Sequence, residues 1–432
     1  MPRRGSIMKN YQEAVDYVTS LEFFGIKLGL KNITTLLAAL GNPERQFKSV
    51  HIAGTNGKGS VSAMLSAIFA EAGYKVGLYT SPHLVSIRER FRINERIIAE
   101  ERFYRLTTEV KAALTADIPV TYFEFTTATA FLLFAQEKVD LAIVETGMGG
   151  RLDATNVLTP ELAVITNIGR DHEAHLGRSL FSITKEKAGI IKPGLSLVTG
   201  IHQPKLLGII QQDCLAFDNP IYVFGQHFRI RRVGMNGFSY QGMWRKLTGL
   251  EVRLQGQHQM GNAALALAAI EIMGSKGLPV DEKVIGEGLK KVNWPGRQEV
   301  FEGSPTILID GAHNPSGVKT LCRALSRDFI YNQLILIWGG MADKDHRAML
   351  KQLAPMAQAI ILTRPRNSRA ADLSILAARL RPFDGAVYLT GQVSEAIEKA
   401  KMLAKETDLI CIAGSLYLVG EAREIIQPSF LH

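Results

Sequence analysis

The glycine-rich run from Gly54 to Ser60 constrains the fold of this chain more than any other feature. Its sequence is Gly-Thr-Asn-Gly-Lys-Gly-Ser, and it lies between the apolar, β-rich segment Phe47–Ala53 and a helical pattern from Lys58 to Ala72. Glycines between a strand and a helix let several backbone N–H groups face one anion, and the helix N-terminus adds its dipole. The run therefore predicts a phosphate-binding loop in an α/β domain.

Two side chains of this loop suit a bound triphosphate. Lys58 could neutralise the β- and γ-phosphates, and the hydroxyl of Ser60 could coordinate Mg²⁺. The spacing departs from the general pattern, because Gly59 separates the lysine from the serine. The alternative is a glycine-rich turn with an incidental lysine, but the flanking strand and helix favour a nucleotide site. The residues expected to hold the nucleotide here are Gly54, Thr55, Asn56, Gly57, Lys58, Gly59 and Ser60.

Strand-like and helical patterns alternate along most of the chain, which predicts mostly parallel sheets covered by helices. Residues 219–255 alternate apolar with polar residues instead, and we expect a small antiparallel addition there. The alternation breaks at the Trp-Pro-Gly-Arg run from Trp294 and resumes at Thr306. The expected organisation is an N-terminal domain over residues 1–293, a linker over 294–300 and a smaller C-terminal α/β domain over 301–432.

Composition limits the partners of the chain. Lys and Arg number 50 and Asp and Glu 41, giving a net charge of +9, but the basic residues are scattered and no RNA-type aromatic motif is present. We therefore expect neither a nucleic-acid nor a membrane partner, and the charge indicates either a solvated basic surface or steering of anions. The longest apolar stretch, around Phe125–Ala135, is too short to span a bilayer.

The cysteines and the N-terminus indicate the compartment. The three cysteines are far apart, odd in number and without metal-ligand spacing, which predicts reduced thiols in the cytoplasm. The basic N-terminal run MPRRGSIMKN is not followed by an apolar region, so it does not read as a secretory signal.

Two candidates for metal chemistry follow predicted strands of the N-terminal domain. Glu145 comes directly after the apolar segment Leu141–Val144, where a Mg²⁺ ligand belongs next to a phosphate loop. The alternative is a carboxylate that caps the following turn. His172 follows the segment Ala163–Thr166 and could be a metal ligand, a general base or a plain surface residue.

Three lysines, Lys185, Lys187 and Lys192, flank the apolar segment Ala188–Ile191. Periodicity alone leaves all three as solvated residues of a helix face. One of them, turned toward the site, could have a lowered pKa, but the sequence does not distinguish which.

The C-terminal domain carries polar candidates of its own. The run Asp-Gly-Ala-His-Asn-Pro starts at Asp310, after the first strand-like segment. Asp310 could accept a ribose hydroxyl bond and His313 could contact a phosphate, or the run is simply a turn. Arg297 would suit a phosphate near a domain boundary, and Asn262, early on a helix, would suit an adenine. The alternatives are a surface arginine and a polar helix residue.

Taken together, ten segments resemble the dihydrofolate synthase/folylpolyglutamate synthase family, a branch of the Mur-ligase superfamily. They occur in the family's order from about residue 54 to 420, so the resemblance covers nearly the whole chain. TYFEF together with GGRLDATN is the more specific signal, because GTNGKGS and WPGR recur across the superfamily. The segments are GTNGKGS from Gly54, TSPHL from Thr80, TYFEF from Thr121, ETGMGGRLDATN from Glu145, TNIGRDH from Thr166, EKAGIIK from Glu186, GNAALALAA from Gly261, WPGR from Trp294, DGAHNP from Asp310 and AGSLYLVG from Ala413.

This resemblance implies an architecture and a set of site residues. The architecture is an N-terminal P-loop ATPase domain with a parallel sheet, a linker and a smaller Rossmann-like domain, with ATP between the two domains. The implied Mg²⁺ ligands are Ser81, Glu145 and His172, in addition to Ser60. The implied ATP contacts beyond the loop are Asn262, Arg297 and Asp310. The implied substrate contacts are Tyr122, Phe123, Leu152, Asp153 and Ala154 for the pterin and Ser415 for glutamate. The implied catalytic residues are Lys58, Lys187, Asp153 and His313, with Lys187 as the lysine that the family carbamylates.

The resemblance also implies the activity. It is the ATP-dependent ligation of L-glutamate to dihydropteroate, to folyl(poly)glutamate, or to both, through an acyl phosphate. The implied cofactors are ATP and two Mg²⁺ ions, the other partners are small molecules, and the chain is expected to be a monomer. Two features depart from the family: Thr146 and Met148 replace Val and Leu, and the pterin-binding segment LEFFGIKLGL from Leu21 is shorter between its halves.

Three other functions remain alternatives. A Mur-type ligase acting on a cell-wall precursor would use the same chemistry, but the TYFEF stretch argues against it. A P-loop module that makes no product predicts slow hydrolysis that glutamate does not stimulate. An ATPase that binds nucleic acid predicts stimulation by DNA or RNA and has only the net charge in its favour.

Overall fold

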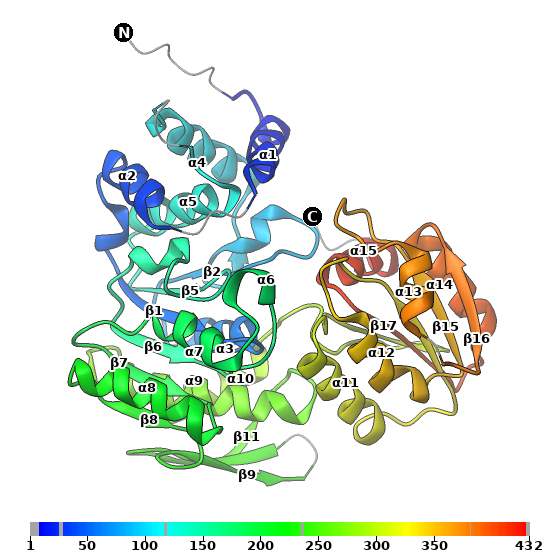
Figure 1. Cartoon of the computed structure of the whole chain (residues 1–432). Coiled ribbons are helices and arrows are strands. Elements are labelled where there is room, and N and C mark those ends of the chain that lie inside the picture. Colours follow the sequence, from blue (N-terminus) through cyan, green and yellow to red (C-terminus); the bar gives the residue numbers. More distant parts are fainter. Residues whose placement is uncertain (1–7, 26–28, 116–118, 235–236, 381, 429–432) are drawn as a thin grey trace. The chain divides into compact units, whose positions relative to one another are not determined.

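The computed structural model separates the chain into two compact units (Figure 1). The first unit takes in most of the chain up to Val292, and the second begins at Asn293. Two short segments from the N-terminal part, His83–Ser86 and Leu254–Gln259, group with the second unit, which a contiguous division into domains does not anticipate. The structure describes residues 8–25, 29–115, 119–234, 237–380 and 382–428.

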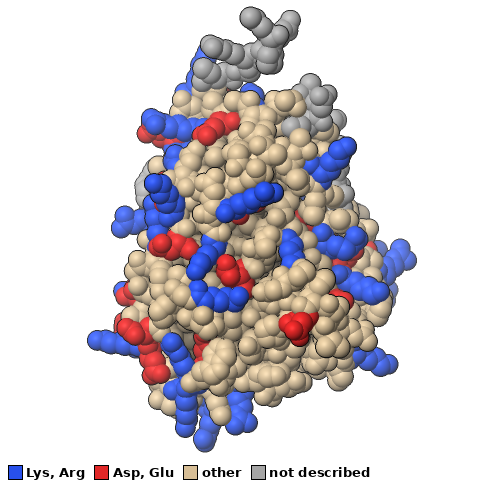
Figure 2. Space-filling model, turned by 90° about the vertical axis from the view of Figure 1, so that its left-hand side faces the viewer, with Lys and Arg blue, Asp and Glu red and all other residues tan. Residues whose placement is uncertain are grey.

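Charged side chains are dispersed on the surface. On the face that Figure 2 shows, Lys and Arg side chains are spread widely, with Asp and Glu between them. This arrangement agrees with the expected scattering of basic residues and shows no single cationic stripe on that face. Among the described residues, no helix is both long and apolar enough to cross a membrane.

The first unit is built on an eight-stranded sheet in the order β4-β3-β2-β5-β1-β6-β7-β8 (Figure 1). Neighbours from β2 to β8 pair in parallel, whereas β3 and β4 extend one edge in antiparallel fashion. The central strands are buried, as expected for a parallel sheet covered on both faces. The strands are β1 (Lys48–Ala53), β2 (Val76–Tyr79), β3 (Phe91–Ile93), β4 (Arg96–Ile97), β5 (Leu141–Glu145), β6 (Leu162–Ile165), β7 (Ser196–Thr199) and β8 (Ile221–Val223).

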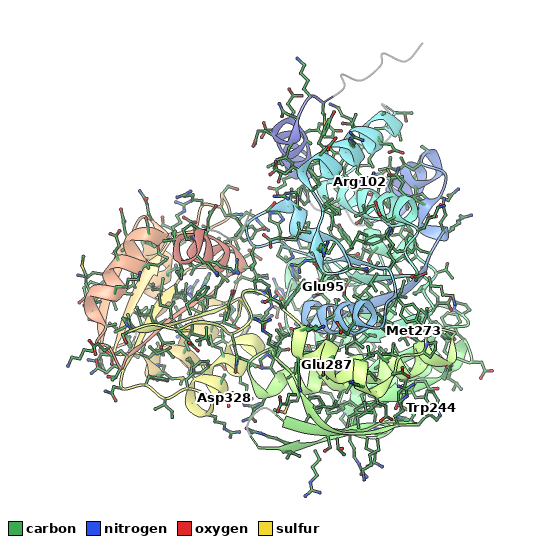
Figure 3. The ribbon with its side chains drawn as sticks, turned by 180° about the vertical axis from the view of Figure 1, so that it is seen from behind. Glu95, Arg102, Trp244, Met273, Glu287 and Asp328 are labelled. Carbon is green, nitrogen blue, oxygen red and sulfur yellow. The ribbon has the colours of Figure 1, made fainter. Side chains whose placement is uncertain are left out.

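Helices cover both faces of this sheet. Figure 1 shows α7 and α8 in front of it, and Figure 3, from behind, shows α9 and α10 with the labelled Met273 and Glu287 on the other face. The helix that follows the glycine-rich loop, α3, packs against α10 and is almost entirely buried. The helices are α1 (Tyr11–Ser20), α2 (Lys31–Ala39), α3 (Lys58–Glu71), α4 (Glu100–Ala113), α5 (Tyr122–Glu137), α6 (Glu173–Leu176), α7 (Leu180–Ala188), α8 (Pro204–Ala216), α9 (Gln257–Ser275) and α10 (Glu282–Lys291).

The apolar stretch around Phe125–Ala135 forms the core of α5 rather than a membrane span. Thr121 caps this helix in a capping box with Glu124, which satisfies two of its first N–H groups. The buried side of α5 packs with α1, α2 and α4 into one apolar cluster beside the sheet. Of the expected pterin-binding segment LEFFGIKLGL, residues 26–28 lie outside the described residues, as does most of the basic N-terminal run.

The expected antiparallel addition is confirmed over residues 229–251. Within the expected range 219–255, residues 221–223 instead form β8, the parallel edge strand of the eight-stranded sheet. The addition is a three-stranded sheet in the order β11-β10-β9, in which the buried Phe238 and Tyr240 alternate with less buried residues. Its strands are β9 (Arg229–Val233), β10 (Gly237–Gln241) and β11 (Lys246–Glu251).

The second unit is a six-stranded sheet in the order β12-β13-β17-β14-β15-β16, parallel except for the edge strand β12. Alternate strand residues face α11, α12 and α13 on one side and α14 and α15 on the other. The last two residues of the expected linker 294–300 belong to the edge strand β12 of this sheet. The strands are β12 (Glu299–Phe301), β13 (Thr306–Asp310), β14 (Leu334–Trp338), β15 (Ala359–Thr363), β16 (Ala386–Thr390) and β17 (Leu409–Ala413). The helices are α11 (Pro315–Arg327), α12 (His346–Leu353), α13 (Leu373–Leu380), α14 (Val393–Leu403) and α15 (Leu416–Ile426).

Candidate active site

The glycine-rich loop joins β1 to α3, as predicted. Gly54 has φ 151° and Gly57 has φ 84°, a region that favours glycine. Neither glycine has room for a side chain. A Cβ on Gly54 would lie 1.8 Å from Oγ1 of Thr166, and a Cβ on Gly57 would lie 2.6 Å from Oδ1 of Asn262. The loop therefore needs glycine at both positions for its conformation and for its close contacts.

The segment after β6 clamps this loop. Thr166 Oγ1 and Asn167 Nδ2 both donate to the carbonyl of Asn56, at 2.7 and 2.8 Å. Asn167 also accepts from the backbone N–H groups of Asn56 and Thr55, each at 3.0 Å. The Thr55 hydroxyl accepts from the Gly169 N–H at 2.9 Å and donates to its carbonyl at 3.1 Å. The protein's own hydrogen bonds thus determine the shape of the loop.

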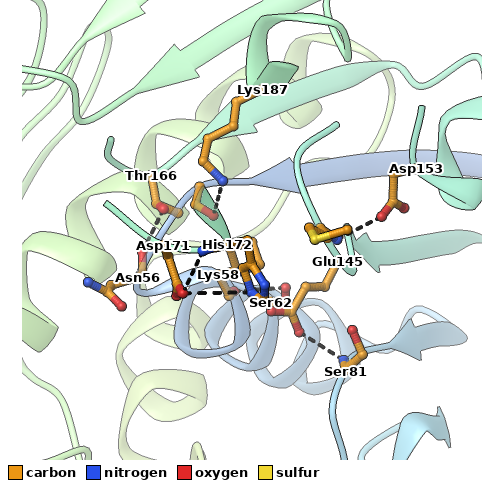
Figure 4. A network of polar contacts seen from close by, with 12 residues as sticks. Asn56, Lys58, Ser62, Ser81, Glu145, Asp153, Thr166, Asp171, His172 and Lys187 are labelled. Carbon is orange, nitrogen blue, oxygen red and sulfur yellow. Dashed lines mark hydrogen bonds and ion pairs between the residues drawn. The ribbon is translucent and has the colours of Figure 1, made fainter. Parts of the chain in front are cut away.

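A cation and a carboxylate meet beside the loop (Figure 4). Lys58 Nζ lies 3.8 Å from Glu145 Oε1, and the N–H of Ser81 donates to Glu145 Oε2 at 3.1 Å. Both ion-pair partners are largely buried, with 16% of the lysine and 6% of the carboxylate side chain exposed. Three loops at the carboxyl ends of neighbouring parallel strands therefore converge on one polar position.

The donor set around Glu145 fits Mg²⁺. That ion is usually held by one or two carboxylates, water and substrate phosphates. Glu145 offers one carboxylate, and Ser81, whose N–H donates to it, offers a candidate hydroxyl. Ser60, the other expected ligand, is buried in the first turn of α3. In the described part of the chain, no group of three or more His, Cys, Asp or Glu is placed to hold a metal. A bound ion would therefore depend on hydroxyl, water and phosphate oxygens as well as on Glu145.

His172 follows β6, as predicted, at the start of α6. Its backbone has φ 51°, and its N–H donates to Asp171 Oδ1 at 2.9 Å. Its Nε2 lies 3.9 Å from the same Asp171 oxygen, and 38% of its side chain is exposed. The ring is therefore partly open to solvent at the same sheet edge as Glu145.

Lys187 is the buried lysine among the three candidates. Its Nζ donates to the Gly54 carbonyl at 2.7 Å (Figure 4). Burial and the positive charge of Lys58 lower its pKa to about 7, while Asp171 and Asp153 oppose that shift. At neutral pH a large fraction of the amine is thus uncharged, beside the phosphate loop.

The other two lysines have different environments. Lys185 is exposed and lies over the Phe181 ring, 4.8 Å from its centroid. Lys192 donates to the carbonyls of Asn156 and Leu158, and burial lowers its pKa to about 8. Only Lys187 of the three bonds to the loop.

The loop after β5 lies against Phe123, one of the expected substrate residues. A Cβ on Gly147 would lie 2.5 Å from the tip of Phe123, whose ring stacks on Tyr79 at a centroid distance of 6.0 Å. Tyr122 lies under the Arg90 guanidinium, 5.1 Å from its ring centroid. In the same loop, Leu152 is half-buried and Ala154 is buried.

Asp153 is buried within this loop. Its carboxylate accepts from the N–H groups of Met148 at 2.8 Å and Thr155 at 3.1 Å, and from the Thr155 hydroxyl. Burial raises its pKa, and these hydrogen bonds oppose that shift. The geometry shows a carboxylate that holds the loop together.

In the second unit, three expected residues gather around Gly311. Asp310 accepts from the N–H groups of Gln298 at 3.0 Å and Ala312 at 2.9 Å; burial raises its pKa, and the Arg297 charge opposes that shift. A Cβ on Gly311 would lie 2.3 Å from Nη1 of Arg297. His313 Nδ1 bonds to the Gly311 carbonyl at 2.8 Å.

Ser415 follows the neighbouring strand β17. Its Oγ accepts from the Leu418 N–H at 3.0 Å and so caps α15. The preceding Gly414 donates to the Ala312 carbonyl at 3.1 Å, which joins this loop to the Asp310 loop. The carboxyl ends of β13 and β17 thus form one polar edge.

Three residues of these sites were not assigned from the sequence. Thr166 and Asn167 clamp the phosphate loop, and Gln298 is buried with φ 47° beside Asp310. Thr166 and Asn167 begin the TNIGRDH segment, which was their available signal, and Gln298 directly follows the candidate Arg297. Their polar side chains carry no spacing pattern of their own.

Comparison with known families decides the assignment. Residues 52–270 match the family described as Mur ligase middle domain, and residues 296–416 match the Mur ligase, glutamate ligase domain. This chain belongs to the Mur ligase family. The predicted recognition and fold class are therefore confirmed.

Relatives along the whole length place this Mur ligase in one branch. It is 34% identical to the dihydrofolate synthase/folylpolyglutamate synthase of Bacillus subtilis (strain 168), covering 96% of this chain and 99% of the relative. It is 32% identical to the protein of that name from Escherichia coli (strain K12), covering 96% and 94%. The predicted enzyme class, an ATP-dependent ligase of this branch, is confirmed.

Solved structures of synthases from the same branch share the fold of this chain. Mycobacterium tuberculosis folylpolyglutamate synthase, complexed with ADP and AMPPCP, superposes with a TM-score of 0.91 at 32% identity, covering 97% of this Mur ligase and 99% of that chain. Escherichia coli FolC, in complex with DHPP and ADP, has a TM-score of 0.88 at 30% identity and 99% coverage of both chains. A bifunctional synthase with Mn, AMPPNP and L-glutamate bound has a TM-score of 0.87 at 30% identity, covering 98% of this Mur ligase and 100% of that chain. ATP and a divalent metal ion are accordingly the cofactors that this fold implies.

Proposed function

We propose that this Mur ligase joins the amino group of L-glutamate to the carboxylate of dihydropteroate and of reduced folates. The observation that carries the proposal is the Lys58–Glu145 pair, 3.8 Å apart at a clamped phosphate loop. The loop that follows Glu145 places Gly147 against Phe123, which offers an aromatic surface next to the phosphate site. Full-length relatives named dihydrofolate synthase/folylpolyglutamate synthase support the same substrates.

The chemistry follows from the charges at the loop. A carboxylate oxygen of the acid attacks the γ-phosphorus of ATP, and the bond to the bridging oxygen breaks, so that ADP leaves. Lys58 and the loop N–H groups stabilise the negative charge on the transferring group. Glutamate's amine then attacks the acyl phosphate, loses a proton and expels phosphate, leaving an amide. A divalent ion held at Glu145 would supply further charge neutralisation at the phosphates.

The second unit carries polar side chains that suit parts of a nucleotide and an amino acid. Asp310, with its carboxylate held by two N–H groups, suits a ribose hydroxyl, and Arg297 and His313 beside it suit phosphates. Ser415 follows β17 at the same sheet edge and suits glutamate. We also propose two Mg²⁺ ions, a monomer and a cytoplasmic location; the three free cysteines support the last.

Product analysis tests the function directly. With ATP, glutamate and dihydropteroate, we expect a glutamylated product and stoichiometric ADP, and with tetrahydrofolate a lengthened glutamyl tail. When the acid carries oxygen-18 in its carboxylate, the label should appear in the released phosphate, because that oxygen bridges carbon and phosphorus in the intermediate. Turnover that required a UDP-sugar peptide instead of a pterin acid would assign a cell-wall precursor as substrate.

We further propose that Lys187 is carbamylated. Its neutral amine can attack CO₂ with loss of a proton, and the resulting carbamate is an anion beside the positive charge of Lys58. Because an ordinary lysine has a pKa of 10.5 and this one about 7, carbamate should form as the pH rises through about 7. The signal of carbon-13 bicarbonate bound to the protein should follow that midpoint and vanish in Lys187→Met. The exposed Lys185→Met is the matched control; equal signals in both variants would contradict the assignment.

A further inference from the structure

A buried chain of polar groups connects β1 to the loop that contains Asp153. His51 lies on β1, three residues before Gly54, and none of its surface is exposed. Its Nε2 is 2.8 Å from Oγ1 of Thr155, which in turn donates to Asp153 Oδ1. The strand that enters the phosphate loop is thus linked through one hydroxyl to the loop that faces Phe123.

The direction of these hydrogen bonds indicates which ring nitrogen of His51 carries the proton. The Thr155 hydroxyl has one proton, and it goes to Asp153, a carboxyl group surrounded by donors. When Asp153 is ionised, His51 Nε2 donates to Thr155, and Nδ1 keeps a lone pair. Burial and the charge of Lys192 lower the pKa of His51 to about 3, so the ring is neutral.

His51 Nδ1 is buried and has no hydrogen-bond partner among the described residues. Such an unsatisfied nitrogen destabilises the fold, whereas an apolar side chain of similar shape would not. The compensating contribution of the imidazole is the one hydrogen bond that it donates. The hydrogen bond to Thr155 is thus the polar contact through which the buried imidazole can act on the loop.

Asp153 determines where its loop lies. Its carboxylate holds the N–H groups of Met148 and Thr155, and so closes the turn between them. At one end of that turn Gly147 contacts Phe123, and near its centre a Cβ on Gly150 would lie 3.0 Å from the Lys187 carbonyl. A shift in the position of the Asp153 carboxylate would therefore move Gly147 and the loop surface that contacts Phe123.

We propose that His51 is a positioning residue for the acid substrate. By donating to Thr155 it orients Asp153, which holds the 147–154 loop against Phe123. The proposal rests on the function proposed above, in which this loop borders the acid. His51 is not expected to position ATP, because Thr166 and Asn167 hold the phosphate loop through separate hydrogen bonds.

Kinetics of paired variants test the proposal. His51→Leu should raise the KM for dihydropteroate about tenfold, as the loss of one buried hydrogen bond predicts, and change the KM for ATP less than about twofold. His51→Gln keeps an N–H near the position of Nε2 and should restore most of the affinity. Thr155→Val should reproduce the defect, and Thr155→Ser, which keeps the hydroxyl, should not. Proportional increases in both KM values would show a general structural role and overturn the proposal.

Hydrogen exchange without substrates provides a readout independent of turnover. The amides of Met148 and Thr155 should exchange faster in His51→Leu than in the wild type, while amides in the middle of α9 should not change. Unchanged exchange at both positions would overturn the proposal even if the enzyme were active. Wild-type protein that made no glutamylated product would instead defeat the proposed function. If His51→Leu does not fold, the Thr155→Val and Thr155→Ser pair decides by the same measurements.

Discussion

Replacing Lys58 with methionine should lower kcat/KM about 100- to 1,000-fold, the effect of removing one strong electrostatic donor from a transition state. The lysine Nζ lies at the clamped loop, 3.8 Å from Glu145, where charge develops on the transferring phosphoryl group. Methionine keeps an unbranched side chain of similar length and removes the ammonium group, with its charge and its N–H donors. Steady-state kinetics with saturating dihydropteroate and glutamate would measure the loss.

Two further measurements show that the effect comes from charge at this position. The Lys58 charge is the second cause that lowers the Lys187 pKa, so Lys58→Met should shift the carbamate titration midpoint to higher pH. Lys185→Met removes an exposed lysine and should leave kcat/KM within about twofold, since surface substitutions have small effects. Lys58→Met turnover close to that of the wild type would show that the triphosphate binds elsewhere.

Gly54→Ala should destabilise the first unit by roughly 3 kcal/mol and abolish tight ATP binding, because overpacking and backbone strain act together. The new Cβ would lie 1.8 Å from Oγ1 of Thr166, and φ of 151° is unfavourable for alanine. Relieving the clash would displace Thr166 from the Asn56 carbonyl and so open the loop. Chemical denaturation and calorimetric titration with ATP would measure the two effects.

A glycine elsewhere provides the control for that variant. Gly208 lies inside α8, and a Cβ there would meet no atom within 4 Å. Gly208→Ala should therefore stabilise the protein by about 0.5–1 kcal/mol and leave ATP affinity unchanged. Adding Thr166→Ala to Gly54→Ala removes the nearest clashing atom, so the double variant should be more stable than the sum of the single effects predicts. Full stability and ATP affinity in Gly54→Ala alone would contradict this account of the loop.

The local sequence pattern was sufficient to predict several helices and strands and the phosphate loop. Gly54 to Ser60 between a strand and a helix, the apolar strand before Glu145, and the antiparallel segment within 219–255 all appear where the spacing indicated. These features depend on residues close in sequence, whose periodicity and turn chemistry are visible directly. The family resemblance then supplied the residue roles that spacing alone left open.

Contacts between distant residues decided the rest. Spacing alone did not distinguish Lys187 from Lys185 and Lys192, because a helix-face pattern does not say which side a sheet will cover. The resemblance pointed to Lys187, and the fold shows the physical basis: its Nζ lies at the Gly54 carbonyl and its pKa is lowered. The division of the chain into units also depends on contacts between distant residues, because His83–Ser86 groups with the second unit although it lies in the N-terminal part of the sequence.

The sequence by itself determined the α/β class, the phosphate loop and the branch of ligases to which the chain is related. The tertiary structure decided which groups are buried together: Thr166 against Gly54, and His51 with Thr155 and Asp153. The physical reason is that charge, pKa and hydrogen-bond partners depend on desolvation by residues far away in the chain. Spacing along the sequence records only the neighbours within a few residues.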